Sequence, residues 1–251
     1  MIGRKNEKES TAMWRMPYTI LRNLFRLPKI LETLHRMTDQ PETYSQQEVY
    51  DYVRYIVGLM ERTGHVKTNT FGQENLPKEG GYVLFPNHQG QYDAYSLVAA
   101  HEGALSLVMD RDRSYFVFVS EIVDALGGKR MDLHNSRQSL TIINQVAQEV
   151  AEGRRYILFP EGGYDQDKKN SLWEFKPGSF KAAVKAKAPI VPVVLVDSYQ
   201  VYNSRRLTPV TTQVHYLPPL YYEEYQTLTT PQIAETVQAR IGEKLAQLGY
   251  G

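Results

Sequence analysis

Two ionisable side chains, His88 and Asp93, lie five residues apart in a short polar segment, residues 87–93 (NHQGQYD). The segment follows an apolar stretch of strand length, residues 82–86, and precedes an apolar helical pattern, so we expect a loop between a strand and a helix. If the loop curls at Gly90, the Asp93 carboxylate can bond one imidazole nitrogen of His88 and leave the other to accept a proton. The pattern indicates a general base that works without a protein nucleophile. A structural histidine and an aspartate that caps the helix explain the same spacing.

A second candidate lies at Phe159–Gly163 (FPEGG), at the end of another apolar stretch, residues 156–159. Glycine lets the backbone approach a ligand closely, and ligands of open α/β sheets gather at the carboxyl ends of strands. The segment therefore indicates a ligand site at Glu161, Gly162 and Gly163. A tight turn that needs glycine only for its backbone conformation is the alternative.

Together the two segments resemble the glycerolipid acyltransferase family, which includes the 1-acyl-sn-glycerol-3-phosphate acyltransferases and other lysophospholipid acyltransferases. The family's first block is a His-x4-Asp motif, here NHQGQYD, and its third block is Phe-Pro-Glu-Gly-Thr-Arg, here FPEGG. Residues 72–77 (GQENLP), 175–180 (FKPGSF) and 191–193 (VPV) also look like the family. The resemblance runs in order from about Val66 to Val196.

The resemblance implies an acyltransferase of phospholipid biosynthesis. In it, His88 deprotonates a hydroxyl of a lysophospholipid, with 1-acylglycerol 3-phosphate as the leading acceptor. Asp93 orients His88, while Glu161, Gly162 and Gly163 hold the acceptor's polar head. The acyl donor is acyl-CoA or an acyl-carrier protein, which is a co-substrate, so no cofactor is expected. The alternatives are another acceptor (glycerol-3-phosphate, another lysolipid or a glycolipid), a hydrolase, and a non-catalytic lipid-binding relative.

Two positions depart from the family pattern. Tyr164 stands where the family has an arginine that is linked to the acceptor phosphate. The second block, which normally ends in Asp-Arg, reads Lys-Arg-Met-Asp-Leu at residues 129–133. We expect Lys129 and Arg130 to replace the missing phosphate ligand, with Lys176 as a further candidate. The sequence leaves open the acceptor head group, the acyl-chain length, the choice of donor carrier and the oligomeric state.

Residues 11–37 form an amphipathic pattern. When they are projected at about 100° per residue, apolar and basic side chains fall on opposite arcs. The apolar arc holds Met13, Met16, Ile20, Leu24, Leu27, Leu31 and Leu34, and the basic arc holds Arg15, Arg22, Arg26, Lys29 and Arg36. Pro17 suits a first helical turn, whereas Pro28 should kink or split the helix.

This pattern predicts a pair of interfacial helices that dock on anionic lipid, with aromatic side chains at the flanks. The expected docking residues are Trp14, Arg15, Arg22, Phe25, Arg26 and Lys29. The protein would then be a peripheral or monotopic protein on the cytoplasmic side of the cell membrane. A helical hairpin that packs on the main domain and exposes a solvated basic face is the alternative.

Composition excludes several classes. The chain has 251 residues, of which 42% are hydrophobic and 23% charged, as in a folded globular protein. A net charge of +1 gives no reason to expect nucleic acid. Because the sequence has no cysteine, disulfides and a cysteine nucleophile are excluded. The histidines lack metal-ligand spacing, so no metal is expected, and no apolar run approaches the roughly 20 residues that span a bilayer.

The elements that must position these residues form an α/β pattern, with a mixed central sheet flanked by helices. We divide the chain into an N-terminal helical membrane-docking segment, residues 1–64, and an α/β acyltransferase domain, residues 65–251. Ser45 and Glu48 form a capping-box sequence for a helix that runs toward Gly64. Strands are expected at residues 66–71, 82–86, 105–109, 156–159, 190–196 and 213–216. Later helices are expected at residues 94–101, 113–125, 136–152, 179–186 and 231–247.

Overall fold

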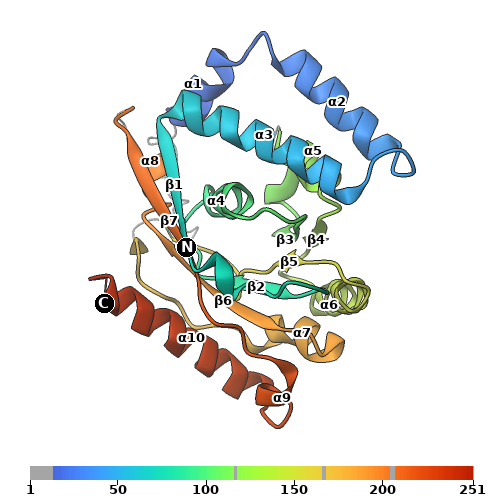
Figure 1. The fold of residues 1–251 in the computed structure, drawn as a ribbon, viewed down its shortest axis with the longest axis vertical. Helices are drawn as coiled ribbons and strands as arrows, with labels where there is room; N and C mark the ends of the chain where they lie inside the picture. The colour runs from blue at the N-terminus through green and yellow to red at the C-terminus, as the bar shows by residue number, and fades with distance from the viewer. Residues whose placement is uncertain (1–13, 116–117, 166–167, 204–206, 251) are drawn as a thin grey trace, which may run out of the picture.

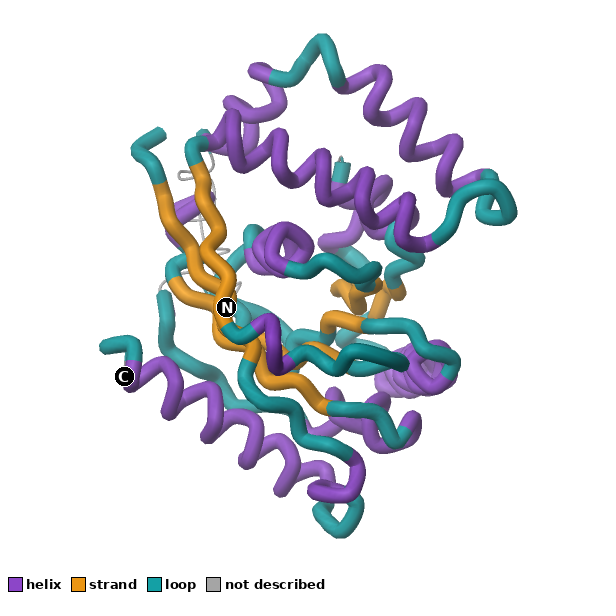
Figure 2. Tube along the Cα trace, viewed as in Figure 1, coloured by secondary structure: helices purple, strands orange, loops and turns teal. Residues whose placement is uncertain are grey.

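The computed structural model describes residues 14–115, 118–165, 168–203 and 207–250. A seven-stranded sheet forms its centre, in the order β1-β7-β6-β2-β5-β3-β4 (Figure 1 and Figure 2). The strands are β1 (Val66–Phe71), β2 (Val83–Pro86), β3 (Ser106–Asp110), β4 (Lys129–Met131), β5 (Tyr156–Ile157), β6 (Ile190–Val196) and β7 (Val210–Tyr216). The pair β6–β7 is antiparallel and the other neighbours are parallel, which confirms the predicted mixed sheet.

Helices cover both faces of the sheet, as Figure 1 shows. One face carries α1 (Arg15–Arg22), α2 (Leu27–Asp39), α3 (Gln46–Gly64), α4 (Asp93–Ala100) and α5 (Val119–Ala125). The other carries α6 (Ser136–Ala151), α7 (Lys181–Ala186) and α10 (Thr230–Gln247). Shorter elements are α8 (Gln200–Asn203), α9 (Tyr222–Tyr225) and the 3-10 turns η2 (Gln73–Asn75), η3 (Arg113–Tyr115) and η5 (Pro177–Phe180).

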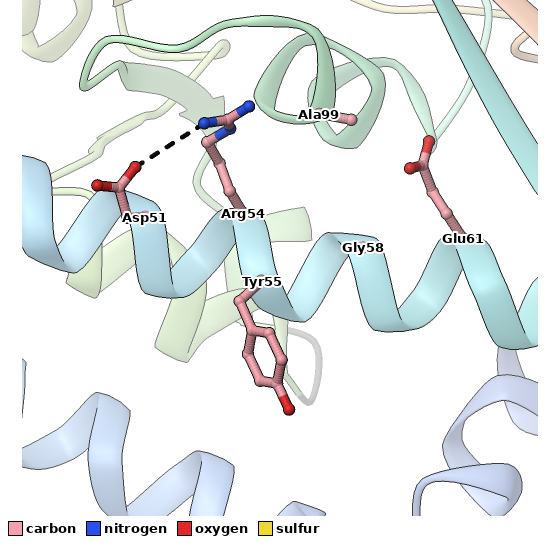
Figure 3. A pocket seen from close by; sticks show the side chains of 6 residues that line it. All are labelled: Asp51, Arg54, Tyr55, Gly58, Glu61 and Ala99. Atoms are coloured by element: carbon pink, nitrogen blue, oxygen red, sulfur yellow. Dashed lines mark ion pairs between the residues drawn. The ribbon is translucent and has the colours of Figure 1, made fainter.

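A polar cavity of about 400 Å³ lies between α3 and α4. Figure 3 shows Arg54 and Glu61 extending from α3 toward Ala99 of α4, while Tyr55 points away from α4. The cavity is lined by Asp51, Arg54, Tyr55, Gly58, Glu61 and Ala99, and none of these is a residue that the sequence singled out for chemistry.

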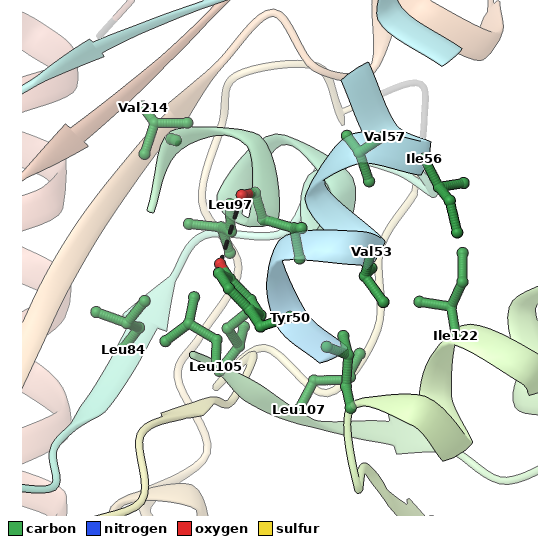
Figure 4. Packing of buried hydrophobic residues seen from close by; sticks show 14 of the residues in the cluster. Tyr50, Val53, Ile56, Val57, Leu84, Leu97, Leu105, Leu107, Ile122 and Val214 are labelled. Atoms are coloured by element: carbon green, nitrogen blue, oxygen red, sulfur yellow. Dashed lines mark hydrogen bonds between the residues drawn. The ribbon is translucent and has the colours of Figure 1, made fainter. Parts of the chain in front are cut away.

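The core is divided between the two faces because side chains of a strand alternate in direction. In β2, Leu84 packs among residues of α3 and α4, whereas Val83 and Phe85 pack among residues of α6, α7 and α10. Figure 4 shows the first cluster, in which Tyr50 and Val53 of α3 lie over the sheet beside Leu97 of α4. Strands that are apolar on both faces are buried on both faces, so β2 is held rigidly at the centre of the fold.

The expected elements are present, with local differences. The capping box of Ser45 and Glu48 is formed, and α3 ends at Gly64, but the left-handed cap residue that follows is His65 (φ 54°) rather than a glycine. Strand β4 was not expected, since three residues that begin with Lys-Arg give no apolar pattern. The expected helix over 113–125 is instead η3 followed by α5. The domain boundary expected after residue 64 coincides with the end of α3 and stays a prediction.

The N-terminal pattern is split between two helices. Residues 23–26 separate α1 from α2, and Pro28 lies in the first turn of α2, as its position predicted. A projection on one continuous helix therefore does not hold across the break. Leu34 is buried, as the alternative of a packed helical hairpin would have it, whereas Leu24 is 50% exposed, as lipid docking would have it. Met13 lies outside the described residues.

Candidate active site

The candidate site lies where four neighbouring parallel strands end. Strands β6, β2, β5 and β3 are adjacent in the sheet, and their carboxyl ends lie at the same edge. His88 follows β2, Glu161 and Tyr164 follow β5, Ser198 follows β6, and Arg113 follows β3. The sheet thus collects at one edge side chains that are distant in sequence, as expected for the ligand-binding edge of an open α/β sheet.

His88 and Asp93 are in direct contact. The imidazole Nδ1 lies 2.6 Å from Asp93 Oδ2, and Asp93 is fully buried whereas the His88 side chain is 16% exposed. An ionised carboxylate only accepts hydrogen bonds, so this contact makes Nδ1 the donor and leaves Nε2 with its lone pair. The contact that the five-residue spacing predicted is therefore present.

The Asp93 carboxylate is fixed by further donors. Its Oδ2 accepts from the backbone N–H groups of Gln89 (2.5 Å) and Gly90 (2.9 Å), and its Oδ1 accepts from Ser198 Oγ (2.5 Å). The two amide donors come from the loop that carries His88, because the chain curls there as the glycine predicted. A carboxylate with this many donors has little freedom to rotate away from the imidazole.

Ser198 and a buried amide network support the loop, and the sequence did not indicate them. Gln89 donates to Leu195 O and to Asn170 Oδ1, both at 2.7 Å, and accepts from the backbone N–H of Ser198 at 3.1 Å. Asn87 donates to Leu195 O (3.0 Å) and accepts from Leu195 N (2.7 Å), which ties the loop to β6. The one signal in the sequence was the position of Ser198, just after a buried strand.

Aromatic rings enclose the His88 imidazole on two sides. Phe159 stacks on it with ring centroids 4.1 Å apart, and Tyr164 meets it edge-on at 4.6 Å. Both rings belong to the loop after β5. Together with the Asp93 bond, they set the orientation of the imidazole before any substrate binds.

Glu161 braces this loop against the loop of His88. It is 3% exposed, and its Oε1 accepts from the backbone N–H of His88 (3.1 Å). Its Oε2 accepts from Lys168 Nζ (2.6 Å) and from Trp173 N (3.1 Å). Burial lowers the pKa of Lys168, and the adjacent carboxylate opposes that shift. The contact with the acceptor's polar head that the resemblance implies for Glu161 would use the remaining acceptor capacity of this carboxylate or replace one of these bonds.

The backbone conformation at Gly162 favours glycine. Its φ is +68°, and an added Cβ would also displace the flexible end of the Lys176 side chain, which passes over it. At Gly163 an added Cβ would meet only ordinary contact, with Trp173 at 3.9 Å. A cavity of about 460 Å³ opens beside Gly162 and is lined by Trp173 and Lys176 among others. The structure thus brings Lys176 next to the predicted ligand loop.

Lys129 and Arg130, the predicted replacements for the phosphate ligand, each have a carboxylate partner in the structure. Both lie within the edge strand β4, not at its carboxyl end, and each is already paired. Lys129 Nζ lies 2.5 Å from Glu149 Oε1, and Arg130 Nη1 lies 2.5 Å from Asp124 Oδ1. Arg130 also donates to Ser114 and Ser120. Because these charges are neutralised inside the fold, we do not assign them to the acceptor phosphate.

The expected docking residues divide into an exposed set and one exception. Trp14 is 67% exposed and Phe25 is 99% exposed, and Arg22, Arg26 and Lys29 are exposed as well. The apolar side chains of Leu21 (67%) and Leu24 (50%) join them. Figure 1 shows the turn between α1 and α2 at an outer end of the molecule.

Arg15 is the exception, and the docking role expected for it is wrong. It is 1% exposed and donates to the carbonyl oxygens of Gly64 (2.7 Å) and Thr208 (2.9 Å). Burial lowers the pKa of its guanidinium. Its side chain holds α1 against the end of α3, which the helical projection could not reveal because the partners are distant in sequence.

In the described part of the chain, no group of three or more carboxylates and histidines is placed to hold a metal ion. Among its helices, none is both long and apolar enough to cross a bilayer.

Comparisons with known proteins agree with this architecture. A family model described as "Acyltransferase" matches residues 67–196. The chain is 26% identical over 191 residues to 1-acyl-sn-glycerol-3-phosphate acyltransferase alpha of Bos taurus, a match that covers 74% of this chain and 63% of that protein. The match therefore spans less than two thirds of that relative. The chain is also 26% identical over 170 residues to the 1-acyl-sn-glycerol-3-phosphate acyltransferase of Salmonella typhimurium. That match covers 67% of this chain and 69% of the relative.

A solved structure shares the fold. The 1-acyl-sn-glycerophosphate (LPA) acyltransferase PlsC of Thermotoga maritima superposes with a TM-score of 0.74 at 18% sequence identity. The superposition covers 94% of this chain and 95% of that one. The N-terminal helices and the sheet therefore belong to one shared architecture.

Proposed function

The chain belongs to the acyltransferase family, and from this premise we propose that it transfers a fatty acyl group from a thioester to a hydroxyl of a lysophospholipid. The leading acceptor is 1-acylglycerol 3-phosphate, because the relatives named above carry that substrate in their names. The donor is acyl-CoA or an acyl-carrier protein. The observation that carries the proposal is the His88–Asp93 contact at the carboxyl end of β2.

The reaction follows from the orientation of the imidazole. His88 Nε2 takes the proton of the acceptor hydroxyl as its oxygen attacks the thioester carbonyl. The new ester bond forms as the carbon–sulfur bond breaks, and the proton passes from Nε2 to the departing sulfur. Asp93 stabilises the imidazolium between these steps. A thioester is already activated, and with no cysteine in the chain we propose direct transfer without an acyl-enzyme.

We propose that the tip of the α1–α2 pair docks on the membrane that supplies the acceptor. We define the docking tip as Leu21, Arg22, Leu24, Phe25, Arg26 and Lys29, and Trp14, at the start of α1, is a further docking residue. Exposed aromatic and aliphatic side chains beside basic ones suit an interface of anionic lipid. The protein would act as a peripheral or monotopic enzyme at the cytoplasmic face.

The test is an assay of purified protein with radiolabelled acyl donor and a panel of acceptors. The panel contains 1-acylglycerol 3-phosphate, glycerol-3-phosphate, lysophosphatidylcholine and monoacylglycerol. We expect labelled diacyl product with the first acceptor, and none from a His88→Ala variant that folds normally. Loss of thioester without any acceptor would instead indicate a hydrolase, and lipid binding without turnover would indicate a non-catalytic relative.

A further inference from the structure

Tyr164 and Arg113 form a pair beside the candidate base. The Arg113 guanidinium lies over the Tyr164 ring, 4.6 Å from its centroid, and the same ring meets the His88 imidazole at 4.6 Å. Tyr164 therefore contacts both the cation and the imidazole. This is the position where the resemblance places an arginine that is linked to the acceptor phosphate.

Arg113 reaches the site because of the sheet topology. It opens η3, directly after β3, and β3 is the neighbour of β5, whose loop carries Tyr164. Adjacent parallel strands deliver their following loops to the same edge, so the two side chains meet although they are far apart in sequence. Neither residue gave a signal in the sequence that would pair it with the other.

Arg113 has a longer ion pair than two other cations near this edge, Arg111 and Lys168. Its Nε lies 3.8 Å from Asp110 Oδ2, and its side chain is 43% exposed. The neighbouring Arg111 lies 3.1 Å from Asp132, and Lys168 lies 2.6 Å from Glu161. A long ion pair at a solvent-exposed position contributes little, so Arg113 can bind a new anion at small cost.

The position of the cation over the ring suits phosphate binding. A guanidinium held over an aromatic ring is attracted to the face of the ring and can still donate its N–H groups to another partner. Those groups match two phosphate oxygens at once, which a lysine ammonium does not. Tyr164 thus acts as a platform that presents the cation.

We propose that Arg113, supported by Tyr164, binds the anionic phosphate of the acceptor and takes the place of the family's arginine. The inference rests on the proposed function, since it names the acceptor contact of that same site. In 1-acylglycerol 3-phosphate the phosphate is on the carbon next to the one that carries the reacting hydroxyl. When the hydroxyl is at His88, the phosphate must therefore bind close to the imidazole. Arg113, which lies over the Tyr164 ring beside His88, is a cation in that neighbourhood.

The experiment compares KM and kcat of Arg113→Ala with those of the wild-type protein, for 1-acylglycerol 3-phosphate and for uncharged monoacylglycerol. We expect KM for the phosphate-bearing acceptor to rise about tenfold to a hundredfold, as for the loss of one or two hydrogen bonds to a charged group. KM for the uncharged acceptor should stay within about twofold. The matched control is Arg111→Ala, which removes the same charge two residues away and should leave both KM values within about twofold.

A rescue variant separates phosphate binding from damage to the fold. The double variant Arg113→Ala with Tyr164→Arg carries the family's arginine at position 164. It should restore part of the affinity for the phosphate-bearing acceptor that Arg113→Ala loses. Tyr164→Ala alone should raise KM for the phosphate-bearing acceptor, because Arg113 then lacks its platform. An equal rise for charged and uncharged acceptors, or no rise in Arg113→Ala, would overturn the proposal.

A binding measurement keeps the inference distinct from the proposed activity. Calorimetric titration of the His88→Ala protein with a short-chain 1-acylglycerol 3-phosphate needs no turnover. We expect heat of binding that is lost or at least tenfold weaker when Arg113→Ala is added. If the wild-type protein shows no transferase activity but this binding still depends on Arg113, the proposed function is refuted and the inference stands. Absent or Arg113-independent binding would refute the inference.

Discussion

The Asp93 carboxylate is fully buried and accepts from four donors, whereas Phe25, in the turn between α1 and α2, is 99% exposed. The loop of His88 is bonded to β6 and to the loops that follow β5 and β6. The docking tip presents large apolar side chains to solvent. The two regions therefore suit different roles. A reacting group needs a fixed orientation, whereas a membrane contact needs an accessible apolar surface.

The largest effect should come from the imidazole itself. His88→Ala removes the base but keeps the backbone N–H of residue 88, which donates to Glu161, so the contact between the two loops should remain. We expect the rate of acyl transfer to fall by about a hundredfold to ten-thousandfold. Initial rates with labelled donor measure this, with the exposed His134→Ala as the matched control. Retention of most of the activity would remove His88 from the mechanism.

The next effect should come from the carboxylate that orients the base. In Asp93→Asn a neutral amide replaces the charge that would stabilise the imidazolium, and Ser198 Oγ must turn from donor to acceptor if the new N–H faces it. We expect the rate to fall by about a hundredfold and the free energy of unfolding by about 1–3 kcal/mol. Rates and denaturant unfolding measure the two effects, and the exposed Asp112→Asn is the control. Wild-type turnover would show that the contact with His88 is structural only.

Ser198 tests how far the rigid region extends. Ser198→Ala removes the donor to Asp93 Oδ1 and should lower kcat about tenfold with KM unchanged, because the imidazole loses part of its fixed orientation. The pH profile of kcat/KM should also shift, which loss of folded protein alone would not produce. Ser171→Ala, at an exposed position, is the control. An unchanged kcat and profile would confine the positioning groups to the loop of His88.

The smallest effects should come from the docking tip and should be on binding rather than on chemistry. Phe25→Ala should weaken binding to anionic vesicles about fivefold to tenfold, with folding unchanged because the side chain makes almost no contact with the rest of the chain. Arg26→Ala should weaken it by about fivefold or less and reduce the dependence on salt. Vesicle sedimentation measures both, with the exposed Tyr221→Ala on the opposite face as control. Equal sedimentation of Phe25→Ala and the wild-type protein would end the docking proposal.

What the sequence could predict was set by distance along the chain. The His88–Asp93 contact spans five residues and one turn of the loop, so residue types and spacing were enough. The Ser45–Glu48 capping box and the helix break before Pro28 are local in the same way. The buried strands β2 and β6 followed from short apolar stretches, which are typical of strands that are covered on both faces.

What the sequence could not predict depended on which strands become neighbours. Ser198 is 105 residues from Asp93, and the two meet only because β6 lies beside β2. Arg113 and Tyr164 meet only because β3 lies beside β5. Lys129 and Arg130 were assigned to phosphate from their charge, whereas their partners Glu149 and Asp124 come from the helices next to β4. Charge alone does not show which cations the fold has already neutralised.

The central claim is direct transfer of the acyl group from a thioester to a hydroxyl, with His88 as the base and no covalent intermediate. The measurement that tests it most directly follows thiol release, new ester and the intact mass of the protein in one reaction with acyl-CoA and 1-acylglycerol 3-phosphate. The account predicts one new ester for each thiol released, no thiol release without acceptor and an unchanged protein mass throughout. An acylated protein, or thiol release that needs no acceptor, would contradict it.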